Sequence, residues 1–186
     1  MDELDAAIDA ALQSDDSIPR ETVREWIRTA QTVESLACLY RLTNEAWNRI
    51  QPRLDPDETR FLIRRYLLLC IRMDPQHSIA LPRYEAAAVL ESWFDHLASM
   101  AGARKTLQEV TTAVTDFFLS GDEQIRLAIE TGFLEHVLEQ PSLRPFFSHW
   151  AQDKRLQGAW QRSLAWGEAH PNQMKRLREQ LLSLEK

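Results

Sequence analysis

The histidines and carboxylates of this sequence are the side chains that could do acid–base or metal chemistry, but their spacing does not favour it. No histidine stands in an HxxxH, HExxH or ExxH pattern, the spacings that bring metal ligands together on one helix. Asp95–His96 and Glu135–His136 are neighbours in sequence, and neighbouring side chains on a helix point apart. The sequence also lacks a GxSxG motif, a P-loop and a GxGxxG motif. We therefore expect no catalytic residue, no metal and no cofactor.

Charged residues instead divide the chain into acidic and basic stretches. Residues 1–16 hold six acidic side chains and no basic one, and residues 106–139 hold seven acidic side chains against one arginine. Residues 144–186 hold eight basic and four acidic side chains. Such asymmetry can steer a charged partner toward one surface, and an acidic surface disfavours nucleic acid. The alternative is that these are ordinary solvated helix faces that happen to cluster.

The middle acidic stretch supplies candidate partner-binding residues. Glu109 and Asp116 share one helix face because they are seven residues apart, which is two helical turns. Asp122, Glu123 and Glu130 lie on the next predicted helix or just before it, and Glu123 is expected to help cap that helix. If the two helices are neighbours, these carboxylates form one acidic patch. We predict that Glu109, Asp116, Asp122 and Glu130 bind a partner.

Six tryptophans could supply aromatic anchors for an interface. Four of them fall on apolar helical stripes, which is typical of core packing. Trp150 and Trp166 lie near predicted helix ends in the basic C-terminal third, so we predict that these two contact a partner. The tryptophans assigned to the core are Trp26, Trp47, Trp93 and Trp160.

The segment "IPRETVREWIRTAQ" suggests the hypothesis of nucleic-acid binding, because it resembles the recognition helix of a helix-turn-helix protein. Arg20, Arg24 and Arg28 are four residues apart and would share one exposed face. Binding to DNA would need a basic footprint around that face, but the preceding helix is strongly acidic and would repel phosphates. We therefore expect no nucleic-acid partner.

Hydrophobic periodicity predicts the elements that carry these residues. We expect an all-α chain of eight or nine helices, packed as irregular HEAT-like helical hairpins or as a compact bundle, in a single domain over residues 1–186. Residues 1–16 form its acidic N-terminal helix, and the last helix is expected over residues 171–184. The clearest helix start is Asp55 as N-cap, Pro56 in the first position and Glu58 in the third.

The stretch "SGDEQIRLAIETGFLEHVLEQP" raises a specific structural question. It has apolar residues on two sides, with Leu127, Leu134 and Leu138 pointing one way, which predicts a helix sandwiched between neighbours. Gly132 either lets another backbone come close or ends the helix after Thr131 as a C′ cap. Ser120 and Glu123 are expected to form a capping box at its start.

The remaining composition predicts a cytoplasmic protein. Cys38 and Cys70 both fall in apolar helical patterns and have no CxxC partner, so we expect buried, reduced thiols. The most apolar run, "YLLLCI", is six residues long, which is too short to cross a membrane. The N-terminal residues lack the features of a signal peptide.

The segment "LSGDEQIRLAIETGFLEHVLE" resembles an uncharacterised family of small all-helical bacterial proteins associated with immunity against interbacterial toxins. That family carries a "GDE–(V/I)R–…–GFLE–L" core, although HEAT-like hairpins also use "D-x-x-(V/I)-R-x-x-(A/V)". The resemblance covers about 20 residues and implies a helical immunity-type fold with no catalytic residue. The matching positions are Gly121, Asp122, Glu123, Ile125, Arg126, Gly132, Phe133, Leu134, Glu135 and Leu138.

Charge and resemblance together give two functional hypotheses. The first is an immunity protein that neutralises a cognate bacterial toxin by covering a basic toxin domain with its acidic surface. The second is a helical-repeat scaffold or regulatory interaction protein for another protein partner.

Overall fold

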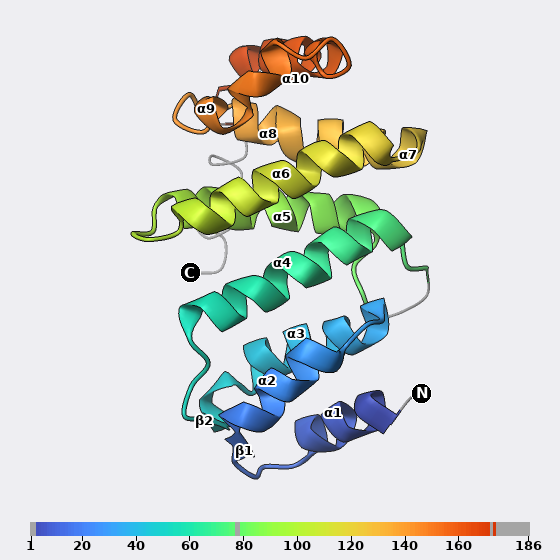
Figure 1. Ribbon diagram of the computed structural model, residues 1–186, viewed down its shortest axis with the longest axis vertical. Helices are drawn as coiled ribbons and strands as arrows, with labels where there is room; N and C mark the ends of the chain where they lie inside the picture. The colour runs from blue at the N-terminus through green and yellow to red at the C-terminus, as the bar shows by residue number, and fades with distance from the viewer. Residues whose placement is uncertain (1–2, 77–78, 172, 174–186) are drawn as a thin grey trace. The chain divides into compact units, whose positions relative to one another are not determined.

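The computed structural model describes residues 3–76, 79–171 and 173, and most of these residues lie in helices (Figure 1). The all-α fold predicted from the sequence is therefore confirmed. Within the described residues, the extended structure is one short parallel pairing of β1 (Ile18–Pro19) with β2 (Ile50–Gln51). The last predicted helix, over residues 171–184, lies almost entirely outside the described residues.

The chain divides into two compact units, residues 1–86 and residues 87–186. Each unit buries its own set of apolar side chains. The prediction of a single domain over residues 1–186 and that of a HEAT-like arrangement stay predictions.

Helix α3 is the centre of the first unit, and α1, α2 and α4 pack against it. Apolar residues recur on more than one side of α3, so Leu36, Leu39 and Leu42 are almost completely buried. The helical elements of this unit are α1 (Glu3–Gln13), α2 (Arg20–Thr29), α3 (Val33–Glu45), the 3₁₀ turn η1 (Trp47–Arg49), α4 (Pro56–Met73) and the start of α5 (Arg83–Ala98).

Helix α4 begins where the sequence predicts. Asp55 is its N-cap and Pro56 its first residue, and the two reciprocal bonds of a capping box are present. The carboxylate of Glu58 accepts a hydrogen bond of 2.7 Å from the backbone amide of Asp55. The predicted helix start is therefore confirmed.

Both cysteines lie in the first unit as buried free thiols, as the sequence predicts. Burial raises the pKa of Cys70 to about 11. Burial also raises the pKa of Cys38, and the nearby carboxylates of Asp9 and Asp5 add to this effect. Because the thiolate is the reactive form, neither cysteine is activated as a nucleophile at neutral pH.

An aromatic cluster forms the core of the second unit. The ring of Phe147 lies 5.9 Å from that of Phe94, 5.7 Å from that of Phe133 and 5.9 Å from that of Trp150. The elements that surround the cluster are the remainder of α5, α6 (Arg104–Ser120), α7 (Glu123–Ile129), the π-turn η2 (Glu130–Leu134), α8 (Glu135–Leu138), α9 (Arg144–Phe147), the 3₁₀ turn η3 (Ser148–Ala151) and α10 (Gln157–Ala169).

The helix around Gly132 neither ends nor continues as a regular α-helix. It widens into the π-turn η2, where the backbone amide of Glu135 bonds the carbonyl of Glu130, five residues back. A π-turn holds one residue more than an α-helical turn, and one residue corresponds to a rotation of about 100°. The residues after η2 therefore face a different direction from the one that an uninterrupted helix would give them.

This rotation changes which leucines are buried. Leu134 and Leu138 are completely buried, whereas Leu127 is 44% exposed. The expectation that these three leucines share one buried side is wrong, because the π-turn lies between Leu127 and the other two. The side of α7 that carries Leu127 faces solvent.

A close backbone approach occurs at Gly167 of α10, a glycine for which the sequence analysis made no such prediction. A Cβ atom at this position would lie 2.7 Å from the backbone nitrogen of Glu139 and 2.7 Å from the carbonyl carbon of Leu138. Helix α10 packs directly on α8, and the absence of a side chain at Gly167 lets the two backbones meet.

Replacing Gly167 by Ala should destabilise the protein. The new methyl group would overlap the backbone at the end of α8 and push α10 away, so we expect a loss of about 1–3 kcal/mol in the free energy of unfolding. The matched control is Gly158→Ala, also in α10, whose Cβ would meet only the flexible end of Arg162 at 3.3 Å. Urea titrations of both variants measure the difference, and equal stability of the two would contradict the close packing.

Candidate functional site

The predicted acidic residues gather where α6 turns into α7. Gly121 makes this turn tight, since its amide bonds the carbonyl of Phe117 at 2.7 Å and an added Cβ would lie 2.5 Å from the same oxygen. Asp116 lies one turn before the end of α6, and Asp122 and Glu123 begin α7, so all three are exposed at one corner. Helices α6 and α7 are neighbours, and the sequence analysis predicts an acidic patch in that case.

The capping pattern at this corner differs from the predicted one. Asp122 is the N-cap of α7, and its Oδ1 accepts a hydrogen bond of 2.8 Å from the amide of Ile125. The hydroxyl of Ser120 instead donates to the carbonyl of Asp116, at 2.6 Å, inside α6. The predicted Ser120–Glu123 capping box is therefore wrong. This leaves the Glu123 carboxylate exposed and without a hydrogen bond among the described residues.

Two of the four predicted carboxylates do not belong to the exposed corner. Glu130 is 13% exposed and forms a two-pronged ion pair with Arg162 of α10, with contacts of 2.6 and 2.8 Å. Glu109 lies about two turns before Asp116, and its carboxylate is 4.0 Å from the ammonium group of Lys105. Glu130 therefore joins η2 to α10.

The two tryptophans predicted as anchors have different environments. Trp150 is completely buried, packs against Phe118 at 4.9 Å and donates a hydrogen bond of 2.9 Å to Thr115. The prediction that Trp150 contacts a partner is corrected, because its side chain is part of the core. Trp166 is partly exposed on α10, between His136 at 4.8 Å and His170 at 4.4 Å, so its role stays a prediction.

Leu127 is a surface residue that the sequence pattern did not reveal. It is 44% exposed and lies one turn after Glu123 on the solvent-facing side of α7. We call Asp116, Asp122, Glu123 and Leu127 together the α7 corner. One basic residue, Arg126, is exposed next to Leu127 in the sequence, so this surface has three carboxylates and one guanidinium. The corner combines an apolar side chain with net negative charge.

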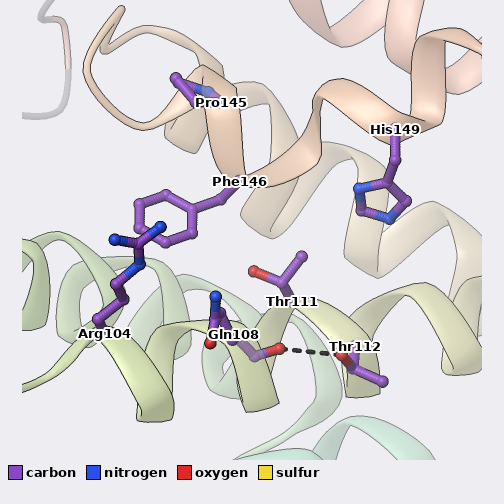
Figure 2. Close-up of a pocket in the computed structure, with 7 residues that line it drawn as sticks. All are labelled: Arg104, Gln108, Thr111, Thr112, Pro145, Phe146 and His149. Carbon is purple, nitrogen blue, oxygen red and sulfur yellow. Dashed lines mark hydrogen bonds between the residues drawn. The ribbon is translucent and has the colours of Figure 1, made fainter.

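A groove lies between α6 and the α9–η3 segment, with a volume of about 510 Å³ (Figure 2). Figure 2 shows Arg104 and His149 at opposite ends, with the Arg104 guanidinium beside the ring of Phe146. No carboxylate lines this groove among the described residues. We call this groove the α6–α9 groove. The residues that line it are Arg104, Gln108, Thr111, Thr112, Pro145, Phe146 and His149.

The hydroxyl groups on the α6 side of the groove already donate their hydrogens. Thr111 donates to the carbonyl of Leu107 at 2.9 Å, and Thr112 donates to that of Gln108 at 3.0 Å, the bond dashed in Figure 2. A hydroxyl has a single hydrogen, so both oxygens have only acceptor capacity left.

The tautomer of His149 is assigned from its contact with Thr115. The Thr115 hydroxyl donates to the carbonyl of Thr111 at 2.8 Å and accepts from the indole of Trp150 at 2.9 Å. His149 Nε2 lies 3.3 Å from the same oxygen, whose hydrogen is already used. With the hydroxyl hydrogen on the Thr111 carbonyl, Nε2 is assigned as the donor, and this tautomer has Nδ1 as an acceptor.

The arginines of α2 form ion pairs within the first unit. Arg20 and Arg24 both reach the carboxylates at the start of α4, where Arg20 Nε is 3.1 Å from Glu58 Oε2. The arginines on the face that resembles a recognition helix therefore have carboxylates beside them, and the expectation of no nucleic-acid partner stays a prediction. The further pairs on this face are Arg24–Glu21 and Arg28–Glu25.

An apolar hollow of about 490 Å³ lies on the first unit between α2 and α4. Ile27 and Phe61 supply its apolar surface, and Phe61 is 42% exposed. Arg65 at its edge donates to the carbonyls of Ile27 and Ala30 at 2.6 and 2.7 Å, which closes the end of α2.

A search for metal sites and membrane spans, and a comparison with known proteins, assign no function to this chain. The described residues contain no group of three or more His, Cys, Asp or Glu side chains placed to hold a metal ion. None of the helices in the described part of the chain has the length and hydropathy that a membrane span requires. Comparison with known protein families, with characterised proteins and with solved structures finds no match for this chain. The immunity-type resemblance therefore stays a prediction.

Glu58 should contribute to stability in a pH-dependent way. Burial raises its pKa, but bonds from the Asp55 amide, Arg24 and Arg20 outweigh burial, so the pKa lies below the ordinary value of 4.5. A lowered pKa in the folded state means that the contribution is complete above about pH 4.5 and is lost as pH falls further. We expect Glu58→Gln to cost about 1 kcal/mol in unfolding free energy at pH 7.

Urea unfolding of the wild type and of Glu58→Gln at pH 7 and at pH 3.5 measures this effect. The two proteins should differ at pH 7 and converge at the lower pH. Glu85→Gln is the matched control, because Glu85 is exposed on α5 and forms no ion pair among the described residues. A difference that persists unchanged at low pH would show that the charge of Glu58 is not the cause.

Proposed function

We propose that this protein is a protein-binding module, an immunity protein that neutralises a bacterial toxin by binding a basic surface of the toxin domain with its α7 corner. The observation that carries the proposal is the exposed Leu127 beside the exposed carboxylates of Asp116 and Glu123. Cytoplasmic location is part of the proposal, because the toxin must be met where it acts.

The chemistry of the α7 corner suits a protein partner. Interfaces commonly place an apolar side chain at the centre, where water is excluded, and charged side chains around it. Leu127 supplies the apolar contact, and the carboxylates attract a basic surface and speed its approach. Toxins that cut nucleic acids have basic clefts for phosphate, so an acidic corner matches them in charge. The resemblance over residues 119–139 includes Asp122 and Glu123 of this corner.

A rigid support favours the same corner. Asp122 is fixed by its bond to the Ile125 amide, and the turn at Gly121 has no room for a side chain. Glu130 and Arg162 join the following turn to α10. Little backbone freedom is therefore lost when a partner binds, which raises affinity for a given contact area.

The partner should be sought as the product of the neighbouring gene. Co-expression with that product should protect cells from its toxicity, and calorimetry should show one-to-one binding that weakens as salt rises. Absence of both binding and protection would contradict the immunity function.

Variants of the α7 corner should separate the contribution of its apolar side chain to partner binding from that of its charged side chains. We expect Leu127→Ala to weaken the Kd about tenfold or more, mainly through faster dissociation. Asp116→Lys combined with Glu123→Lys should lower the association rate about tenfold at low salt. Asp122 is left unchanged because it caps α7.

Matched controls test whether the corner itself is responsible. Met100→Ala removes an apolar side chain of similar exposure, 40%, elsewhere on the second unit. Asp15→Lys combined with Glu85→Lys makes the same charge change at two exposed positions outside the corner. Both controls should bind as the wild type does, and equal weakening by corner and control variants would exclude the α7 corner as the contact.

A helical scaffold or regulatory protein is the second candidate function. The observation in its favour is the apolar hollow of the first unit, where Phe61 is 42% exposed beside Ile27. In that case Phe61→Ala, and not Leu127→Ala, should remove partner binding in the same pull-down, and the partner need not be toxic.

A further inference from the structure

We propose that the α6–α9 groove binds a small organic anion, a flat ring that carries a carboxylate or a phosphate. This site is separate from the α7 corner, and the inference does not depend on the proposed function. Its volume of about 510 Å³ lies within the range of small-molecule sites, which is about 300–1,000 Å³.

The anion would bind at the Arg104 end of the groove. Arg104 forms no ion pair with any described residue, and no carboxylate among the described residues lines the groove. Lys105 follows it and is 89% exposed, and its Nζ lies 4.0 Å from Oε1 of Glu109. A guanidinium group presents paired N–H donors that match the two oxygens of a carboxylate or phosphate. The unpaired charge therefore favours an anion at this end.

The flat ring would pack against Phe146. The Phe146 ring is partly exposed, and the edge-on ring of Phe94 holds it in place from inside at 5.5 Å. Figure 2 shows that the Arg104 guanidinium lies beside this ring. Aromatic rings pack favourably on one another in offset or edge-on arrangements. A ligand ring on Phe146 would therefore bring an attached anion within reach of Arg104.

The opposite end of the groove accepts hydrogen bonds. Thr111 and Thr112 have only acceptor capacity left, and His149 keeps Nδ1 as an acceptor because Nε2 donates to Thr115. A ligand with an N–H or O–H donor opposite its anion would satisfy both ends. The groove therefore has a cation at one end and hydrogen-bond acceptors at the other. A suitable probe for a carboxylate ligand is 4-aminobenzoate, and a suitable probe for a phosphate ligand is adenosine monophosphate.

Titrations followed by two-dimensional amide NMR measure binding directly. With the full chain labelled by ¹⁵N, 4-aminobenzoate or adenosine monophosphate should shift the amides of Gln108 and Thr112 with a Kd on the order of 1 mM or tighter. The neutral counterparts, 4-aminobenzamide and adenosine, should shift them at least about tenfold less at equal concentration. Comparison of the two anions tells whether the site takes a carboxylate or a phosphate.

Two substitutions test the roles of the lining residues. Arg104→Gln should weaken binding of the anion at least about tenfold while the remaining amide spectrum stays unchanged. Phe146→Leu should weaken binding of the ring-bearing probes, with circular dichroism confirming that the variant is folded. Arg126→Gln is the control, because Arg126 is an exposed arginine of α7 outside the groove.

Three results would overturn the inference. These are saturable shifts that do not depend on the anionic group, unchanged binding by Arg104→Gln, and no saturable shift with either anion up to about 10 mM. None of these results concerns the toxin partner, so the groove and the α7 corner can fail independently.

Discussion

The second unit depends on aromatic contacts between segments that are distant in sequence. Phe94 of α5, Phe133 of η2, Phe147 of α9 and Trp150 of η3 meet in one cluster, and Phe118 of α6 joins it through Trp150. Short helices such as α9 have little stability of their own, so packing of this kind must hold them in position. The cluster also supports both candidate surfaces. It carries Phe146 of the groove through Phe94, and it joins the π-turn after the α7 corner through Phe133.

Sequence reasoning succeeded where the deciding interaction is local. The capping box of Asp55 and Glu58 needs two residues three positions apart, and such spacing is visible in the sequence. It failed where the interaction joins distant segments. Glu130 was predicted to face a partner, but it pairs with Arg162, 32 residues later. Trp150 was placed at the surface because it lies near a helix end, and the core that buries it comes from other helices. The groove was missed for the same reason, since α6 and α9 supply its two sides.

The distribution of charge in the sequence overstates the charge that a partner can meet. Several carboxylates of the acidic stretches are engaged inside the protein: Asp122 caps a helix, Glu130 pairs with Arg162, and Asp5 accepts a hydrogen bond from Ser35. The acidic corner is therefore small. Its carboxylates would mainly govern how fast a partner arrives, whereas the time that the partner stays bound would depend on Leu127.

The π-turn at Glu130–Leu134 has a consequence for how such a surface can change. An insertion of one residue inside a helix is absorbed by one wide turn, so the elements on either side keep their own packing. Loss of that residue would turn α7 by about 100° relative to α8 and present a different side chain at the position of Leu127. A single-codon deletion at this turn would therefore change both the outward-facing residue of α7 and its buried side, where Ala128 and Ile129 lie. Divergence of binding specificity in a chain of this architecture can proceed by length change as well as by substitution.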